Sequence, residues 1–168
     1  MPLLLARVDD RLIHGQVAHG WAAALRPTLF LIVSDVLAGD PARSELYLFA
    51  IPEGTSGRCV SVREALGPAM RSAIERERTI LLFSGLEEPL RLAEAGFPLA
   101  ELNVGGLHHA PGKEPVLPYV FLDATDRERL RRLDGLGVRV AARDLPSNPE
   151  HGLAELLAPR GGSAGSAA

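Results

Sequence analysis

The sequence contains one cysteine and no long apolar run. Cys59 has no second cysteine with which to form a disulfide, and one thiol cannot build a zinc cluster. The apolar residues 3–5 are too few for a signal peptide or a membrane span, and no charged segment precedes them. These absences predict a soluble, cytoplasmic protein.

The chain also has no excess of positive charge. Its formal net charge is -3, from 18 basic and 21 acidic residues among 168. This balance provides no basic stripe along a duplex, so we exclude nucleic acid as a partner. The length is typical of one domain with a substantial core, which we assign to residues 1–158. We expect the end of the chain, residues 159–168, to form a disordered tail rich in Gly, Ser and Ala.

Short apolar segments alternate along the chain with segments of helical spacing. Several of the apolar segments are continuously apolar, which is typical of strands buried on both faces of a parallel sheet. The pattern predicts an α/β fold, a single doubly wound domain with a mainly parallel sheet of about seven strands and helices on both faces. The expected strands are 3–8, 28–33, 58–62, 79–84, 101–104, 119–122 and 138–142, and the expected helices are 15–25, 41–51, 62–75, 87–95, 125–136 and 149–157.

Four loops that follow expected strands carry residues suited to binding. Ligands of doubly wound sheets bind at the carboxyl ends of the strands. The loop with His14 follows the first strand, and residues 34–35, 84–85 and 105–106 each follow another. We expect these loops to converge on one site. Residues 105–118 are rich in Gly and Pro, and we expect a long surface excursion that could hold a short extra strand.

His14 stands between the first strand and the first helix, in the run ARVDDRLIHGQV of residues 6–17. The start of a helix has unpaired N–H groups and a positive dipole end, which favour a phosphate. A histidine there can accept a phosphoryl group, and Arg11 is close enough in sequence to hold phosphate oxygens. The alternative is an ordinary strand–turn–helix corner with a surface histidine.

Other polar groups compete with His14 for a functional interpretation. Asp9 and Asp10 could serve acid–base chemistry or a metal, but Arg7 and Arg11 flank them. Their position favours capping groups or ion-pair partners that orient the arginines.

The segment after the fifth expected strand gives weaker signals. Residues 103–106, NVGG, resemble a phosphate turn only faintly and lack both nucleotide-binding patterns. His108 and His109 have no third ligand at metal-binding spacing, so we expect exposed loop residues. We therefore expect no metal and no other cofactor.

Several of these segments occur together in a known family. The run RVDDRLIHGQV, followed by Trp21 and then by LIVSD (31–35), LLFS (81–84) and NVGG (103–106), resembles the enzyme IIB component of the mannose/fructose/sorbose family of the bacterial phosphoenolpyruvate-dependent sugar phosphotransferase system. The resemblance extends from about residue 3 to about residue 157 and includes LPSNP (145–149). It implies a doubly wound, mainly parallel α/β domain and a phosphotransferase activity. In that family a IIB histidine accepts a phosphoryl group from a IIA component and passes it to a sugar that crosses the membrane through the IIC and IID components.

Carried onto this sequence, the family histidine is His14, and the arginine beside it is Arg11; the resemblance implies that the phosphoryl group is attached to Nδ1 of His14. Backbone N–H groups from Ile13 to Gln16 are then expected to hold phosphate oxygens. The remaining motif positions expected near the phosphate are Asp10, Gly15, Gln16 and Ser84.

The resemblance also implies how the site meets its partners. A carrier must release its phosphoryl group, so we expect a shallow, exposed site instead of a deep pocket. Leu12 and Ile13 are expected to be exposed beside His14 and to contact the partner protein. We expect a separate IIA chain as donor, because no IIA-like segment precedes Met1, and we keep a homo-oligomer as a possibility.

The sequence departs from the family after its double glycine. Leu107, His108 and His109 stand where members often have methionine followed by polar or aromatic residues, so the choice of partner or the coupling to a sugar could differ. Two further hypotheses stay open at this point. One is a regulatory phosphocarrier of the same family without sugar transport, and the other is an α/β protein that binds a nucleotide or a flavin.

Overall fold

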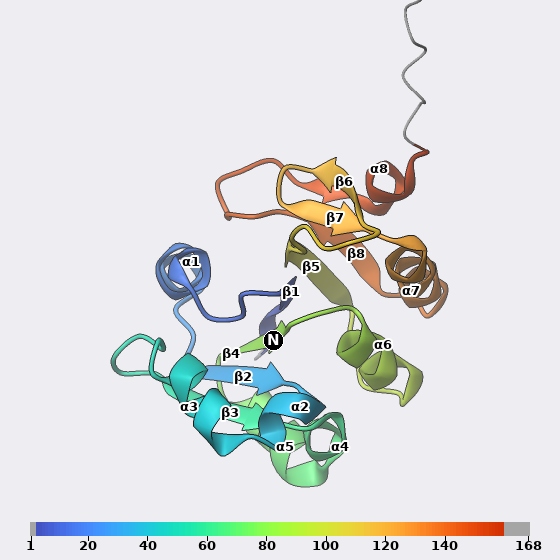
Figure 1. The fold of residues 1–168 in the computed structure, drawn as a ribbon. Helices are drawn as coiled ribbons and strands as arrows, with labels where there is room; N and C mark the ends of the chain where they lie inside the picture. The colour runs from blue at the N-terminus through green and yellow to red at the C-terminus, as the bar shows by residue number, and fades with distance from the viewer. Residues whose placement is uncertain (1–2, 160–168) are drawn as a thin grey trace, which may run out of the picture.

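A seven-stranded sheet forms the centre of the protein in a computed structural model that describes residues 3–159 (Figure 1). Its strand order is β3-β2-β4-β1-β5-β8-β9, and every neighbouring pair is parallel except β8 and β9. The sheet confirms the predicted α/β, mainly parallel architecture. The strands are β1 (Leu3–Asp9), β2 (Leu29–Val33), β3 (Ser56–Val60), β4 (Thr79–Phe83), β5 (Glu101–Gly106), β8 (Arg139–Ala142) and β9 (His151–Gly152).

Helical segments follow most of the strands. Asp40 and Asp123 cap α3 (Pro41–Leu48) and α7 (Ala124–Gly135) by accepting hydrogen bonds from backbone N–H groups. The expected helix 62–75 is two helices, because Gly67 is extended and Pro68 begins a new helix. The helical segments are η1 (Gln16–Trp21), α1 (Ala22–Leu25), α2 (Asp35–Ala38), α3 (Pro41–Leu48), α4 (Val62–Leu66), α5 (Pro68–Arg76), α6 (Glu87–Glu94), α7 (Ala124–Gly135) and α8 (Leu153–Leu157).

The prediction that residues 119–122 form a strand of the main sheet is wrong. Both edges of β5 are already paired, one with β1 and the other with β8. The segment β7 (Val120–Leu122) therefore pairs with β6 (Glu114–Leu117) in a separate antiparallel ribbon, and β6 is the extra strand that the surface excursion 105–118 was expected to hold. The seventh place in the sheet belongs to β9, where a helix was expected, and α8 begins only at Leu153.

Two apolar cores lie on opposite faces of the sheet. The larger contains residues from α4 to α8 and from β7, and the smaller contains residues from η1, α2 and the loop before η1. Figure 1 shows α1 on one side of the sheet and α6 and α7 on the other. The continuously apolar strands β2 and β4 face both cores, which explains why every residue in them is buried.

The carboxyl end of β1 lies where the strand order changes direction. From β1 the chain goes to β2 on one side, and from β4 it crosses over β1 to β5 on the other. Such a switch point opens a space at the sheet edge for a ligand or a reactive side chain. The loop that carries His14 begins there.

Two further expectations concern a membrane-spanning helix and the C-terminal tail. Among the helices of residues 3–159, none is both long enough and apolar enough to cross a lipid bilayer. The predicted disordered tail lies outside the described residues, apart from Pro159.

Candidate functional site

The loop after β1 is held in place by two buried side chains. Leu12 is 1% exposed and Ile13 is 5% exposed, and both belong to the smaller core. The prediction that they are exposed and contact a partner is therefore wrong. Leu12 also has a φ of 56°, a conformation that is unfavourable for a leucine and is sustained here by its burial. This anchoring fixes the backbone on which His14 stands.

Asp9, the last residue of β1, is the centre of the site. Its carboxylate is fully buried and accepts a hydrogen bond from Arg7 at 3.0 Å and one from the backbone N–H of Arg11 at 3.1 Å. The side chain of Arg11 adds two more, from Nε at 3.1 Å and from a terminal nitrogen at 3.2 Å. The prediction that an aspartate orients the flanking arginines is confirmed for Asp9.

Arg7 carries a fully buried guanidinium group beneath this carboxylate. One terminal nitrogen bonds Asp9, and the other donates to Asn103 Oδ1 at 2.8 Å and to the backbone oxygen of Arg143 at 3.0 Å. The guanidinium carbon lies 5.4 Å from the centre of the Trp21 ring, which adds a cation–π contact. A buried charge is tolerated only when it is paired and hydrogen-bonded in this way.

The two glycines of the NVGG segment make room for the buried ion pair. A Cβ atom on Gly105 would lie 1.9 Å from the guanidinium carbon of Arg7, and one on Gly106 would lie 2.9 Å from Asp9 Oδ1. Both distances are too short for any side chain. Glycine is therefore required at positions 105 and 106 by the close approach of Arg7 and Asp9. This packing accounts for the NVGG segment, and no phosphate-binding turn is needed to explain it.

His14 bonds Asp9 through one ring nitrogen and leaves the other facing the loop. Nε2 lies 2.9 Å from Asp9 Oδ2, and Nδ1 lies 3.4 Å from the backbone N–H of Gln16. Because a carboxylate only accepts hydrogen bonds, Nε2 carries the proton, and the lone pair of Nδ1 accepts the hydrogen bond from Gln16. The His14 side chain is 18% exposed, so it is less exposed than the sequence led us to expect.

The surroundings of Asp9 and His14 favour an ionised carboxylate and a neutral imidazole, the two protonation states that the hydrogen bond between them requires. Burial raises the pKa of Asp9, but hydrogen bonds from Arg11 and His14 and the charge of Arg7 outweigh it, and the net pKa is lowered. Burial lowers the pKa of His14, assisted by the nearby arginines and opposed by Asp9. Asp9 is therefore ionised at neutral pH, and His14 is a neutral imidazole.

Arg11 and Gln16 form the solvent-exposed side of the site. The Arg11 side chain is 39% exposed and donates a hydrogen bond of 2.9 Å to Gln16 Oε1. The helix predicted over 15–25 ends at Leu25 as expected, but its first part is the π-helical turn η1 and only its last part, α1, is α-helical. π-helical turns are rare in proteins, and those that occur are often found at functional sites.

A second aspartate–histidine pair lies beside the first. Asp10 accepts hydrogen bonds from the backbone N–H of His108 at 2.7 Å and from its ring at 2.6 Å. Donor atoms of Asp9, Asp10 and His108 lie within 4.8 Å of one another, as metal ligands can. The Asp9 carboxylate, however, is already occupied by two arginines and His14. We therefore place no metal ion there.

The loops that begin at Ser84 and Ser34 lie at the same edge of the sheet as His14, but only the first follows a strand that pairs with β1. Ser84 follows Phe83, which pairs with Val8 of β1, so it comes after the strand next to Asp9. Residues 34–35 build a local structure: Ser34 caps α2, and Asp35 bonds the backbone of Val62 and the side chain of Arg91.

The sequence did not predict the contact between Arg7 and Asn103. They are 96 positions apart, and only the pairing of β1 with β5 brings them together. A charged residue within an otherwise apolar strand was the one available signal, because such a residue is buried only with partners.

The chain was compared with known proteins. It matches the family described as "PTS system sorbose subfamily IIB component" over residues 3–165. It is 34% identical over 149 residues to the sorbose-specific EIIB component of Klebsiella pneumoniae, covering 89% of this chain and 91% of that protein. It is 32% identical over 157 residues to the mannose-specific EIIAB component of Escherichia coli K12, covering 94% of this chain but 49% of that protein, so it spans about half the length of that relative.

A comparison with solved structures gives the same result. The crystal structure of the IIBSor domain of the sorbose permease from Klebsiella pneumoniae superimposes with a TM-score of 0.85 at 33% sequence identity. The match covers 93% of this chain and 96% of that domain.

Proposed function

Because the chain belongs to the sorbose-subfamily IIB components of the phosphotransferase system (PTS), we propose that it is a phosphohistidine carrier with His14 as its phosphoryl acceptor. The family resemblance seen in the sequence is thereby confirmed. The observation that supports this assignment most directly is the hydrogen bond between Asp9 and His14 Nε2, which leaves Nδ1 as the nucleophile. A neutral imidazole held by a buried carboxylate is a competent nucleophile for phosphoryl transfer.

Two transfer steps follow from this arrangement. In the first, the lone pair of His14 Nδ1 forms a bond to the phosphorus of a phosphohistidine on a IIA protein, and the P–N bond of the donor breaks. In the second, a sugar hydroxyl oxygen forms a bond to that phosphorus, the P–N bond of His14 breaks, and the hydroxyl proton passes to water. Asp9 stabilises the positive charge that develops on the His14 ring in the first step.

The phosphoryl oxygens need donors on the Nδ1 side of the ring. The backbone N–H of Gln16 already points at Nδ1, and Arg11 is bonded to the Gln16 side chain. We propose that these groups, with the backbone of Ile13 and Gly15 and the hydroxyl of Ser84, hold the phosphate. Asp10 would repel a phosphate, so its contribution is to hold the loop at His108.

The partners follow from the same family membership. We propose a IIA protein as donor and membrane components IIC and IID as the route of the sugar. The relatives are named for sorbose, mannose, fructose and N-acetylgalactosamine, so the substrate class is a hexose or a hexose derivative. The protein would then work in the cytoplasm and associate with the membrane through its transport partners.

The direct test is to measure the intact mass after incubation with phosphoenolpyruvate, the general PTS proteins and a matching IIA component. We expect a mass increase of one phosphoryl group that is lost on acid treatment, and fragmentation should locate it on His14. A protein that stays unmodified while the same donors modify another IIB component would contradict the proposal.

The lowered pKa of His14 predicts the pH dependence of phosphoryl acceptance. Only the neutral ring attacks phosphorus, so the rate falls when the pH drops below the pKa of His14. Because burial lowers this pKa from 6.5, the midpoint should lie below pH 6.5. Following the His14 ring signals by NMR during a pH titration measures the same midpoint without any donor. A midpoint above 6.5 would show that Asp9 dominates over burial.

Replacing Arg11 with lysine should slow phosphoryl acceptance about 10-fold. Lysine keeps the charge but cannot bond Asp9 and a phosphate oxygen with separate nitrogens of one planar group. Single-turnover transfer from phosphorylated IIA measures this rate. Arg91→Lys is the matched control, because Arg91 pairs with Asp35 on an exposed surface. Equal rates for wild type and Arg11→Lys would restrict Arg11 to a structural contribution.

A further inference from the structure

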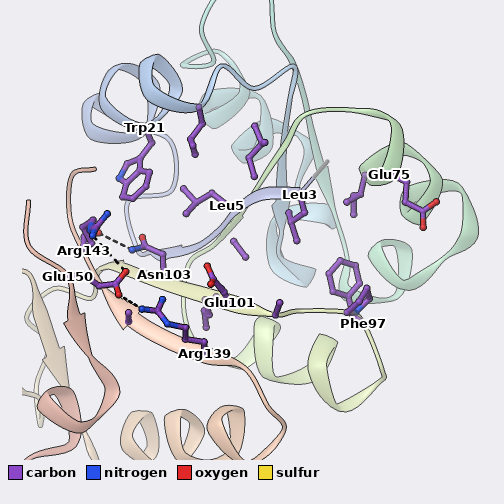
Figure 2. A pocket seen from close by; sticks show the side chains of 18 of the residues that line it. Leu3, Leu5, Trp21, Glu75, Phe97, Glu101, Asn103, Arg139, Arg143 and Glu150 are labelled. Atoms are coloured by element: carbon purple, nitrogen blue, oxygen red, sulfur yellow. Dashed lines mark hydrogen bonds and ion pairs between the residues drawn. The ribbon is translucent and has the colours of Figure 1, made fainter. Parts of the chain in front are cut away.

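A groove of about 640 Å³ lies along β1, β5 and β8 (Figure 2). It is lined by Leu5, Asn103 and Ala141 from these three strands, and by Trp21 from η1. The groove extends from Trp21 and Arg143 at the carboxyl ends of the strands to Phe97 and Glu75 at their amino ends, as Figure 2 shows. Its volume is typical of sites for small organic molecules.

The groove has an apolar body and a polar cluster at its Arg143 end, which we call the polar end, and it is also lined by the charged residues Arg71, Glu75 and Glu101. Leu3, Leu5, Leu25 and Trp21 provide apolar surface between the strands and α1. At the polar end, Figure 2 shows Asn103, Arg139, Arg143 and Glu150 grouped together. Small-molecule sites commonly combine an apolar lining with a few polar groups in this way.

Arg143 is the group at the polar end that lacks a hydrogen-bond acceptor. Arg139 has a close ion pair with Glu150, which compensates its charge. Arg143 lies 3.9 Å from the same carboxylate, too far for a hydrogen bond, and its side chain is 32% exposed. The Arg143 guanidinium group donates no side-chain hydrogen bond within residues 3–159, so its exposed end is available to donate to an oxygen atom of a ligand in the groove.

We propose that this groove binds a small organic anion with an apolar body. The anionic group would accept hydrogen bonds from Arg143, and the apolar part would lie along Leu5 and Trp21. The carbonyl oxygen of Arg143, the side chain of Asn103 and the ring of Trp21 all contact Arg7. The groove therefore adjoins the residues that hold Asp9, although its binding of a ligand is independent of the proposed phosphoryl transfer.

Trp21 is the single tryptophan of the chain, so it reports directly on the groove. The probe is anilinonaphthalene sulfonate, which joins an aromatic body to an anion and accepts energy from tryptophan. We expect saturable quenching of Trp21 fluorescence with one probe bound per chain. Arg143→Gln should weaken binding about 10-fold, while the backbone oxygen that bonds Arg7 is retained.

Two comparisons distinguish the contribution of the probe's charge to binding from the contribution of its fit in the groove. Phenylnaphthylamine, which lacks the sulfonate, should bind wild type and Arg143→Gln equally. Ala141→Phe fills the groove and should weaken the binding of both probes about 10-fold. Arg131→Gln, at an exposed arginine of α7, is the matched control and should bind both probes as wild type does.

The main competitor for the probe is Phe49, which is 93% exposed. If the groove is the site, Phe49→Ser should bind the sulfonate probe with unchanged affinity. The proposal is overturned by an absence of saturable quenching, by loss of binding in Phe49→Ser, or by unchanged binding in Arg143→Gln. Circular dichroism of each variant verifies folding, and Arg143→Gln keeps the test decisive if Ala141→Phe does not fold.

Discussion

Replacing His14 with alanine is expected to abolish phosphoryl acceptance and to leave the protein folded. The loss should be complete within detection, because Nδ1 of His14 is the atom that forms the new bond to phosphorus. The fold should survive because Asp9 keeps its hydrogen bonds to Arg7 and Arg11. We expect the free energy of unfolding to fall by about 1 kcal/mol, the usual cost of one hydrogen bond.

The measurement is the intact mass after incubation with phosphorylated IIA, alongside a urea unfolding curve. His19→Ala is the matched control, because His19 is an exposed histidine five residues further along, in η1. It should accept a phosphoryl group at the wild-type rate. A phosphoryl group on the His14→Ala protein would place the acceptor elsewhere and refute the proposed function.

The predictable part of the fold was the part set by local patterns. Continuous apolar runs such as 79–84 identified strands buried on both faces, and the helical spacing over 41–51 identified the helix that begins at Pro41. The position of β7 was not predictable, because it depends on which edges of β5 are free, and β8 is contributed by a segment of chain beyond β7. Strand pairing over such distances has no local signal.

In the candidate site, too, the features set by the local sequence were predictable and those set by long-range packing were not. The family motif gave the positions of His14 and Arg11, but it gave neither the burial of Leu12 and Ile13 nor the contacts of Arg7 with Asn103 and Trp21. An amphipathic pattern cannot distinguish an apolar side chain at a loop surface from one that anchors the loop. The positive φ of Leu12 turns its side chain into the smaller core, and no sequence rule predicts that conformation for leucine.

The second large effect is expected from Asp9→Asn, which should impair both stability and transfer. The buried Arg7 would lose its only anionic hydrogen-bond partner among the described residues, and such a loss typically costs 3–5 kcal/mol, so we expect unfolding to become easier by about that amount. Asp35→Asn is the matched control, because Asp35 also pairs with an arginine but is exposed. That variant should lose about 1 kcal/mol or less. Urea unfolding of both proteins measures the difference.

The effect of Asp9→Asn on transfer should exceed what unfolding alone explains. An asparagine can present its NH₂ group to Nε2 of His14, which moves the ring proton to Nδ1 and removes the nucleophilic lone pair. We expect the transfer rate of the folded fraction to fall about 100-fold or more, as when a catalytic histidine loses the carboxylate that sets its tautomer. Nitrogen NMR of the His14 ring distinguishes the two tautomers directly. A folded Asp9→Asn protein whose Nδ1 stays unprotonated and whose transfer rate is unchanged would show that Asp9 supports only the fold. A protonated Nδ1 with slow transfer would show that the buried carboxylate prepares His14 to accept the phosphoryl group.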